Sequence, residues 1–155
     1  MTKNKYLSLF LILTITFIAS GIGGFVTASF KEPWYSEIIL PSFNPPSWVF
    51  APVWTVLYVL MSVAIWRVWT KSLNAEILKI YFYHIFFNAI WSIIFFGFHL
   101  PFFALIDLLI IILFVIYLAY AYKKFDQSSF YLTIPYILWI LYAFVLNLSI
   151  VILNN

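Results

Sequence analysis

The sequence predicts an all-α membrane protein, a bundle of five transmembrane helices with a loop rich in proline and tryptophan between the first two. Hydrophobic residues make up 66% of the 155-residue chain and charged residues only 8%, whereas soluble domains carry about 25% charged residues. Apolar stretches close to the length of about 20 residues that crosses a hydrocarbon core cover residues 6–30, 53–69, 80–100, 102–122 and 130–153. The connections between them are short, so we expect residues 1–155 to form a single transmembrane domain.

The first apolar stretch has two interpretations. Lys3 and Lys5 precede it, and small residues stand at Ala19 and Ser20, a pattern that cleaved signal peptides also show. Its hydrophobicity continues to Phe30, however, whereas the core of a signal peptide spans about 7–15 residues. We therefore expect an uncleaved first helix.

A strip of small residues follows one face of this first helix. Ser20, Gly24 and Ala28 are spaced four residues apart, and such a strip lets a second helix backbone approach closely. The second helix belongs either to the same bundle or to another copy in a dimer. The sequence leaves both interpretations open.

The segment from Trp34 to Ala51 joins the first and second apolar stretches. Prolines occupy five positions between 33 and 52, and proline interrupts helical hydrogen bonding, so we expect no continuous helix through them. Residues as apolar as Trp48 would be unfavourable on the loop of a soluble protein. We expect this segment to lie at the membrane surface as a lid over the bundle.

The second expected helix carries Trp54, Tyr58 and Met61 on one face, because they follow one another at helical spacing. Aromatic residues also gather in packed cores and at membrane interfaces. The face is therefore either ordinary core and interface packing or one wall of a site.

The third expected helix has a polar group in the middle of an apolar span. His84, Asn88, Trp91 and Phe95 share one stripe. A side-chain amide at this depth needs a hydrogen-bonding partner. That partner is either a neighbouring helix or a ligand.

Asp107 is the one carboxylate within an expected span, six residues after Pro101 and thus about 9 Å into the fourth helix. An ionised group there costs about 2.5–3.5 kcal/mol unless it is paired, protonated or solvated. The spans carry no basic residue at a comparable depth. We therefore expect Asp107 to line a cavity and not to form a buried salt bridge.

The fifth expected helix contains Pro135, which removes a backbone hydrogen bond and favours a kink. Tyr136, Trp139 and Ala143 follow on one face, with Asn147 one turn further. The small Ala143 leaves either a recess for a flat ring or a point of close helix packing.

Basic residues indicate the orientation of the chain. In a five-helix bundle the N-terminus and the second and fourth connections lie on one side of the membrane. The Lys and Arg residues of this side are Lys3, Lys5, Arg67, Lys71, Lys79, Lys123 and Lys124. The other side carries one such residue, Lys31. The positive-inside rule then predicts a multi-pass protein of the bacterial cytoplasmic (inner) membrane, with a cytoplasmic N-terminus and with the long loop and the C-terminus outside.

This orientation brings the singled-out groups toward one region in the outer half of the bundle. The expected pocket residues are Tyr35, Pro45, Trp54, Tyr58, Asn88, Trp91, Asp107, Trp139 and Ala143. Such a pocket is apolar, aromatic and sparsely polar, as sites for small hydrophobic ligands are. The absence of cysteine excludes thiolate metal sites. His84 and His99 are candidate haem ligands, but only His99 lies near the outer rim, and we expect no metal site.

These residues fall in motifs that resemble the tryptophan-rich sensory protein/translocator protein (TspO/MBR) family, whose mammalian members were called peripheral benzodiazepine receptors. The matching stretches are Trp34-Tyr35, Pro45 to Tyr58, Asn88 to Ser92, Phe95 to Gly97, Ala104 to Asp107, Pro135 to Trp139, Leu146-Asn147 and Leu153-Asn154. They occur in the family's order over about 120 residues, so the resemblance is specific.

The resemblance implies a five-helix bundle that often forms a homodimer. It also implies that porphyrins, haem and isoquinoline or benzodiazepine-type drugs bind under the first loop, in the nine pocket residues given above. The tetrapyrrole is then a ligand, and no cofactor is required. Some family members look able to degrade protoporphyrin in light, and the residues that match the tryptophans involved are Trp54 and Trp139.

Two departures from the family pattern limit this transfer. His84 stands where the family usually has a glutamine, four residues before Asn88. The family's sterol motif needs an aromatic and a basic residue near the C-terminus, and residues 147–155 contain no Tyr, Lys or Arg. We therefore do not expect cholesterol transport.

The leading hypothesis is an integral membrane receptor or transport-type protein that binds porphyrins or haem, with tetrapyrroles or drug-like small molecules and the lipid bilayer as partners. One alternative is a light-dependent, porphyrin-degrading enzyme. Another is a regulatory membrane protein whose helix faces bind a partner protein. We expect no nucleic-acid partner.

Overall fold

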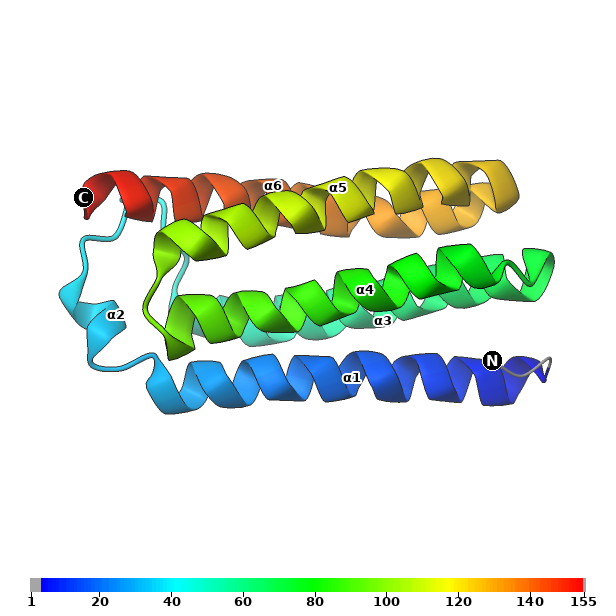
Figure 1. The fold of residues 1–155 in the computed structure, drawn as a ribbon, viewed down its shortest axis with the longest axis horizontal. Helices are drawn as coiled ribbons and strands as arrows, with labels where there is room; N and C mark the ends of the chain where they lie inside the picture. Colours follow the sequence, from blue (N-terminus) through cyan, green and yellow to red (C-terminus); the bar gives the residue numbers. More distant parts are fainter. Residues whose placement is uncertain (1–3, 155) are drawn as a thin grey trace.

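The computed structural model describes residues 4–154, and the elements within this range are all helical. They are α1 (Lys5–Phe30), α2 (Trp34–Glu37), α3 (Ser47–Ser72), α4 (Ala75–Ser92), the π-helical segment η1 (Ile93–Gly97), α5 (Pro101–Phe125) and α6 (Gln127–Leu153). Figure 1 shows the long helices side by side along the longest axis of the molecule. In residues 4–154, five helices are long and apolar enough to cross a membrane, with η1 continuing α4. The predicted five-helix membrane bundle is confirmed.

Helix α3 begins at Ser47, whereas the sequence predicted its start at residue 53. Pro52 therefore lies inside the helix, in its second turn. A proline in the second turn removes the one hydrogen bond that its amide would donate to the residue four positions earlier, and only the first turn of the helix precedes it. Trp48 beside it is 75% exposed, so this end of α3 lies on the surface of the bundle.

Helix α4 also differs from its expected range of 80–100. It begins at Ala75 because the side chain of Asn74 caps it, accepting hydrogen bonds from the amides of Glu76 and Ile77. At the other end the chain widens into η1 and leaves the helix at Gly97. His99 then adopts a left-handed backbone conformation with φ of 56°, which turns the chain toward α5.

The N-terminus and the α3–α4 and α5–α6 connections lie at one end of the bundle, here called the inner end (Figure 1). The C-terminus and the connection from α1 to α3 lie at the other end, the outer end. Lysines of the inner end are Lys5, Lys71, Lys79, Lys123 and Lys124, while Lys3 lies outside the described residues. The distribution of basic residues on which the orientation was predicted is thus present in the fold.

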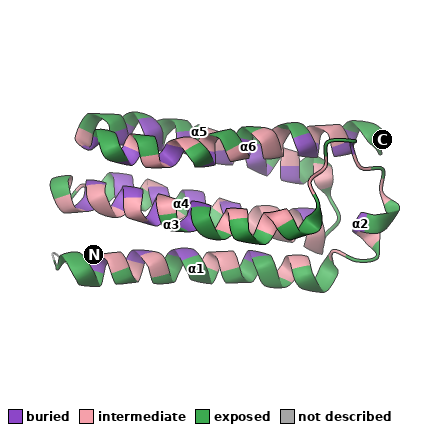
Figure 2. Ribbon diagram, turned by 180° about the vertical axis from the view of Figure 1, so that it is seen from behind, coloured by how far each residue is buried: buried purple, intermediate pink, exposed green. Residues whose placement is uncertain are grey.

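Apolar side chains cover the outside of the bundle as well as its core. Figure 2 shows buried residues on the faces that helices turn toward each other and exposed residues along their outer faces. Phe25, Leu113 and Leu138 are 63–70% exposed. So much exposed apolar surface is unfavourable in water and favourable against lipid tails. The chain is a multi-pass membrane protein.

A buried carboxylate holds two elements together at the inner end. Asp126, between α5 and α6, accepts hydrogen bonds from Arg67 Nε at 2.7 Å and from Lys71 Nζ at 2.6 Å. Its side chain is only 3% exposed, and Ser129 Oγ donates to it at 2.7 Å. The hydrogen bond from Arg67 is the main reason that the pKa of Asp126 is held well below its usual range. This cluster ties α3 to the α5–α6 connection.

Candidate functional site

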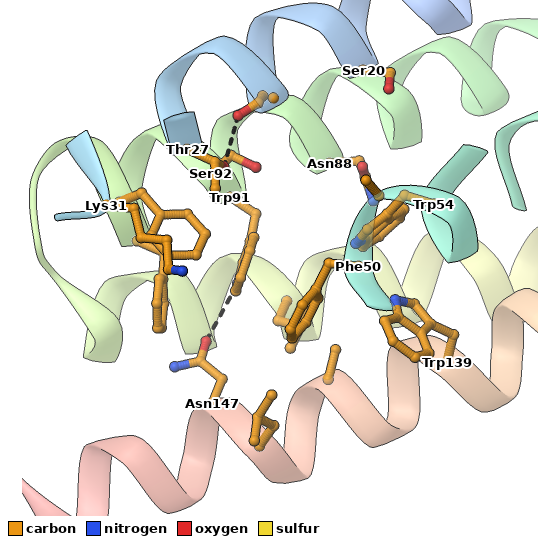
Figure 3. A pocket seen from close by; sticks show the side chains of 18 of the residues that line it. Ser20, Thr27, Lys31, Phe50, Trp54, Asn88, Trp91, Ser92, Trp139 and Asn147 are labelled. Carbon is orange, nitrogen blue, oxygen red and sulfur yellow. Dashed lines mark hydrogen bonds between the residues drawn. The ribbon is translucent and has the colours of Figure 1, made fainter. Parts of the chain in front are cut away.

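A cavity of about 470 Å³ lies in the outer half of the bundle, within the range of about 300–1,000 Å³ that is typical of small-molecule sites. Side chains from the long helices and from the α1–α3 connection surround it (Figure 3). The predicted residues that line it are Tyr35, Trp54, Tyr58, Asn88, Trp91, Trp139 and Ala143. The fold therefore brings most of the predicted pocket together, and its role in binding stays a prediction.

Pro45 and Asp107 are not among the residues that line this cavity. Pro45 lies in the α1–α3 connection, where its carbonyl accepts a hydrogen bond from Asn44 Nδ2 at 3.4 Å. Asp107 is 4% exposed, so it is buried between helices. The neighbouring Leu108 faces the cavity instead, because successive residues of a helix point about 100° apart. Asp107 therefore does not line this cavity, and its part in binding a ligand stays a prediction.

One wall of the cavity is built from indole rings. Trp54 stacks on Tyr58 with ring centroids 5.3 Å apart, as their spacing of one turn on α3 predicted. The Trp54 ring also meets Trp139 of α6 edge to face, at 6.4 Å and 88°. Phe50 also meets Trp139 edge to face, with ring centroids 6.0 Å apart. Such edge-to-face pairs hold aromatic rings in fixed orientations.

A second aromatic wall comes from α4 and η1. Trp91 stacks on Phe95 with centroids 4.9 Å apart and planes 18° from parallel. The Trp91 indole N–H donates to Asn147 Oδ1 of α6 at 3.3 Å, drawn in Figure 3. The amide nitrogen of Asn147 in turn donates to the carbonyl of Pro101 at 3.0 Å. This network fixes the Trp91 ring against the cavity.

Polar side chains connect three helices at the floor of the cavity. Tyr58 Oη donates to Asn88 Oδ1 at 2.6 Å, and Asn88 Nδ2 donates to Tyr136 Oη at 3.1 Å. The hydroxyl of Tyr136 also lies 2.7 Å from His84 Nε2. The amide nitrogen of Asn88 can only donate, so the proton of Tyr136 is free to bond His84. Asn88 thus joins helices and lines the cavity at once.

The two histidines lie away from the cavity. His84 is 1% exposed, beneath Tyr136. His99 stacks on Trp34 with centroids 4.6 Å apart, and its Nε2 donates to the carbonyl of Phe30 at 3.0 Å. Neither lines the cavity, so neither is placed to bind the iron of a haem inside it. The described residues contain no group of three His, Asp or Glu that could hold a metal ion.

The α1–α3 connection contributes residues to the lining of the cavity. Tyr35 is 8% exposed and donates from its hydroxyl to Asn44 Oδ1 at 3.0 Å. Burial raises the pKa of its phenol. The connection is fastened to α6, because Tyr142 Oη donates to the carbonyl of Phe43 at 2.7 Å and Asn154 bonds both backbone groups of Ile39.

The small-residue strip of α1 faces the cavity. Ser20, Gly24 and Ala28 all line it, and a Cβ added to Gly24 would meet nothing within 4 Å. A Cβ added to Gly23 would lie 3.0 Å from Ser92 Oγ. Close packing of α1 on α4 therefore depends on Gly23, which the strip prediction did not single out.

The lining residues that the sequence prediction missed include Lys31, Glu32 and Phe50. The strip of α1 was singled out, but for helix packing or dimerisation and not as part of the pocket. Phe50 precedes the expected start of its helix, so its position on a helical face was not apparent. The sequence does single out Lys31, because it is the single lysine on the side with few basic residues. This distribution indicates the orientation of the chain and does not by itself indicate a binding role.

Comparisons with known proteins agree with this fold. Residues 10–153 match the TspO/MBR family. The chain is 34% identical over 134 residues to the tryptophan-rich protein TspO of Archaeoglobus fulgidus, covering 85% of this chain and 87% of that protein. It is 34% identical over 144 residues to the tryptophan-rich sensory protein of Cereibacter sphaeroides (92% and 91% covered), and 31% identical over 140 residues to the translocator protein of Homo sapiens (84% and 82% covered). The chain belongs to the TspO/MBR family.

Proposed function

We propose that this protein is a membrane receptor or transport-type protein that binds porphyrins or haem in the cavity of the outer half, together with planar drugs of the isoquinoline and benzodiazepine classes. The observation that carries the proposal is an aromatic cavity of about 470 Å³ in a chain of the TspO/MBR family. The relatives' names, tryptophan-rich sensory protein and translocator protein, accord with it.

The walls of the cavity suit a flat, aromatic ligand. The rings of Trp54 and Trp139 on one side and of Trp91 on the other offer faces and edges to a planar macrocycle, and each aromatic pair contributes about 0.5–1.5 kcal/mol beyond its buried area. Asn88 supplies polar groups at the edge. We propose that the segment from Trp34 to Ala51 acts as the lid that covers such a ligand.

Titration with protoporphyrin IX in the dark tests the proposal, read as quenching of tryptophan fluorescence in detergent-purified protein. We expect saturable quenching, with affinity reduced at least tenfold in Trp54→Ala and in Trp139→Ala. Trp48→Ala is the matched control, because Trp48 is 75% exposed and does not line the cavity. Non-saturable quenching that none of the three substitutions changes would mean partition into the micelle, and would favour a regulatory membrane protein instead.

A second candidate function is light-dependent degradation of protoporphyrin IX. The contact between Trp54 and Trp139 at 6.4 Å favours it, because two indoles beside a photoexcited macrocycle are oxidisable groups within its reach. Illumination of the complex then yields a new product over several turnovers while the protein stays intact. Loss of one equivalent of porphyrin together with tryptophan oxidation would show sensitised damage and exclude enzymatic turnover.

We further propose that the N-terminus and the inner end face the cytoplasm of a bacterial cell, in its cytoplasmic membrane. The lysines of the inner end support this orientation. The chain contains no cysteine, so single cysteines can report accessibility. In intact cells a membrane-impermeant maleimide should label Ser42→Cys in the α1–α3 connection and spare Lys79→Cys. The opposite labelling pattern would contradict the orientation.

A further inference from the structure

Lys31 holds a position that the aromatic walls do not explain. It follows the last residue of α1, at the outer end of the bundle, and lines the cavity. Among the described residues that line the cavity, it carries the only positive charge and Glu32 the only negative one. Figure 3 shows Lys31 at one side of the cavity and Trp139 at the other, with Trp91 between them.

The Lys31 ammonium is held in place by its neighbours. Its Nζ donates to Ser47 Oγ at 2.9 Å and lies 4.9 Å from the centre of the Tyr35 ring. The side chain is 22% exposed, so it is largely sheltered although it lies at the outer end of the bundle. Ser47 begins α3, and the contact therefore joins the outer ends of α1 and α3 beside the cavity.

The negative partner of Lys31 is loosely held. Glu32 Oε1 lies 3.4 Å from Lys31 Nζ, and the Glu32 side chain is 53% exposed. Its other carboxylate oxygen accepts a hydrogen bond from Ser36, which is the main reason that the pKa of Glu32 is lowered. Ion pairs this exposed contribute little, so a second carboxylate can replace Glu32 on the ammonium at small cost.

The basic residues around Asp126 provide a contrast. Arg67 and Lys71 converge on a carboxylate that is 3% exposed and also bonded by Ser129. If a ligand carboxylate took Arg67 and Lys71 from Asp126, the Asp126 carboxylate would remain as a buried charge without its partners. Lys31 is the sheltered cation with an exchangeable partner, and it faces a cavity.

We propose that Lys31 selects ligands that carry a carboxylate, holding that carboxylate in place of Glu32 while the aromatic part of the ligand lies against the tryptophans deeper in the cavity. This inference rests on the proposed function and adds the residue that recognises the ligand's carboxylate and the orientation of the ligand. A charge-assisted hydrogen bond to a sheltered ammonium is stronger than one in open water. Lys31 then separates acidic tetrapyrroles from neutral planar molecules of the same shape.

Paired titrations with protoporphyrin IX and with its dimethyl ester test the inference, because the two share a macrocycle and differ in their carboxylates. We expect Lys31→Met to weaken binding of the acid about tenfold, which equals about 1.4 kcal/mol, and to leave the affinity for the ester unchanged. Lys31→Arg should restore most of the affinity for the acid. Glu32→Gln should strengthen binding of the acid, because it removes the competing carboxylate.

Lys79→Met is the matched control, since Lys79 is an exposed lysine on α4 at the inner end, and it should change neither affinity. Equal loss of both ligands in Lys31→Met would show a structural role, and unchanged affinity for both would show no role; either result overturns the inference while saturable binding leaves the proposed function standing. Non-saturable uptake of both compounds by the unmodified protein would overturn the proposed function as well.

Discussion

The inner and outer halves of the bundle are built from the same helices but are packed differently. In the inner half Ala64, Ile65 and Val68 of α3 are at most 1% exposed, and Tyr81 of α4 packs among them at 1%. In the outer half the same helices line a cavity of about 470 Å³. A protein interior is normally filled to the density of an organic crystal, so the unfilled outer half is the exception.

Residue size and position explain the difference. The outer half of α1 presents Ser20, Gly24 and Ala28 to the cavity, and these leave space that the opposing aromatic rings do not fill. The inner half instead ends in the Asp126 cluster, which joins the helices. We infer that the inner half supplies stability and the outer half is available for a ligand.

Removing the Asp126 carboxylate at the inner end should have the largest effect on stability. Asp126→Ala leaves Arg67 and Lys71 without their buried partner, and we expect the free energy of unfolding to fall by about 2–3 kcal/mol, below the value for fully buried pairs because both cations are partly exposed. Thermal unfolding in detergent measures the loss. The exposed Glu37→Ala serves as control and should cost less than about 0.5 kcal/mol. Equal losses in the two variants would contradict the assignment.

The same carboxylate predicts a dependence of stability on pH. Because the pKa of Asp126 is lowered in the folded state, its contribution is complete above the ordinary aspartate value of 3.8 and is lost as the pH falls below it. Between pH 7 and pH 3 the unmodified protein should therefore lose more stability than Asp126→Asn. Parallel curves for the two proteins would show that another group is responsible.

One substitution made in both halves compares their packing directly. Ala64 is fully buried, and its carbonyl accepts a hydrogen bond from Ser129 at 2.9 Å. Ala64→Leu should destabilise the protein by about 1–3 kcal/mol through overpacking. Ala143→Leu extends into the cavity and should change stability by less than about 0.5 kcal/mol. Similar losses at the two positions would mean that the outer half is packed as tightly as the inner.

The hydrogen bonds of Tyr136, between the two halves, should contribute less to stability. Tyr136→Phe removes the hydroxyl that bonds both His84 and Asn88, leaving buried polar groups without a partner, at a cost of about 1–2 kcal/mol. Tyr131→Phe is the control, because Tyr131 is 57% exposed. Chemical unfolding followed by circular dichroism separates the two. Equal stability of the two variants would show that these hydrogen bonds do not stabilise the protein.

Much of the fold and part of the cavity lining could be predicted from the sequence. Apolar length and helical spacing located the spans and placed Trp54 and Tyr58 on one face, because both signals are local. Asp107 could not be placed, since the rotation of α5 about its own axis decides whether it or Leu108 meets the cavity, and the sequence does not give that rotation. The contact of Lys31 with Ser47 joins residues that a non-helical connection separates, and no periodicity describes such a segment.

The space in the outer half is the site that we propose for a planar ligand. The most direct test of this site is the affinity of Ala143→Leu for protoporphyrin IX, measured beside the thermal unfolding of the variant. We expect binding to be weakened about tenfold, or about 1.4 kcal/mol, with an unchanged midpoint of unfolding. Unchanged affinity in the folded variant would contradict it, and would place any porphyrin elsewhere on the protein.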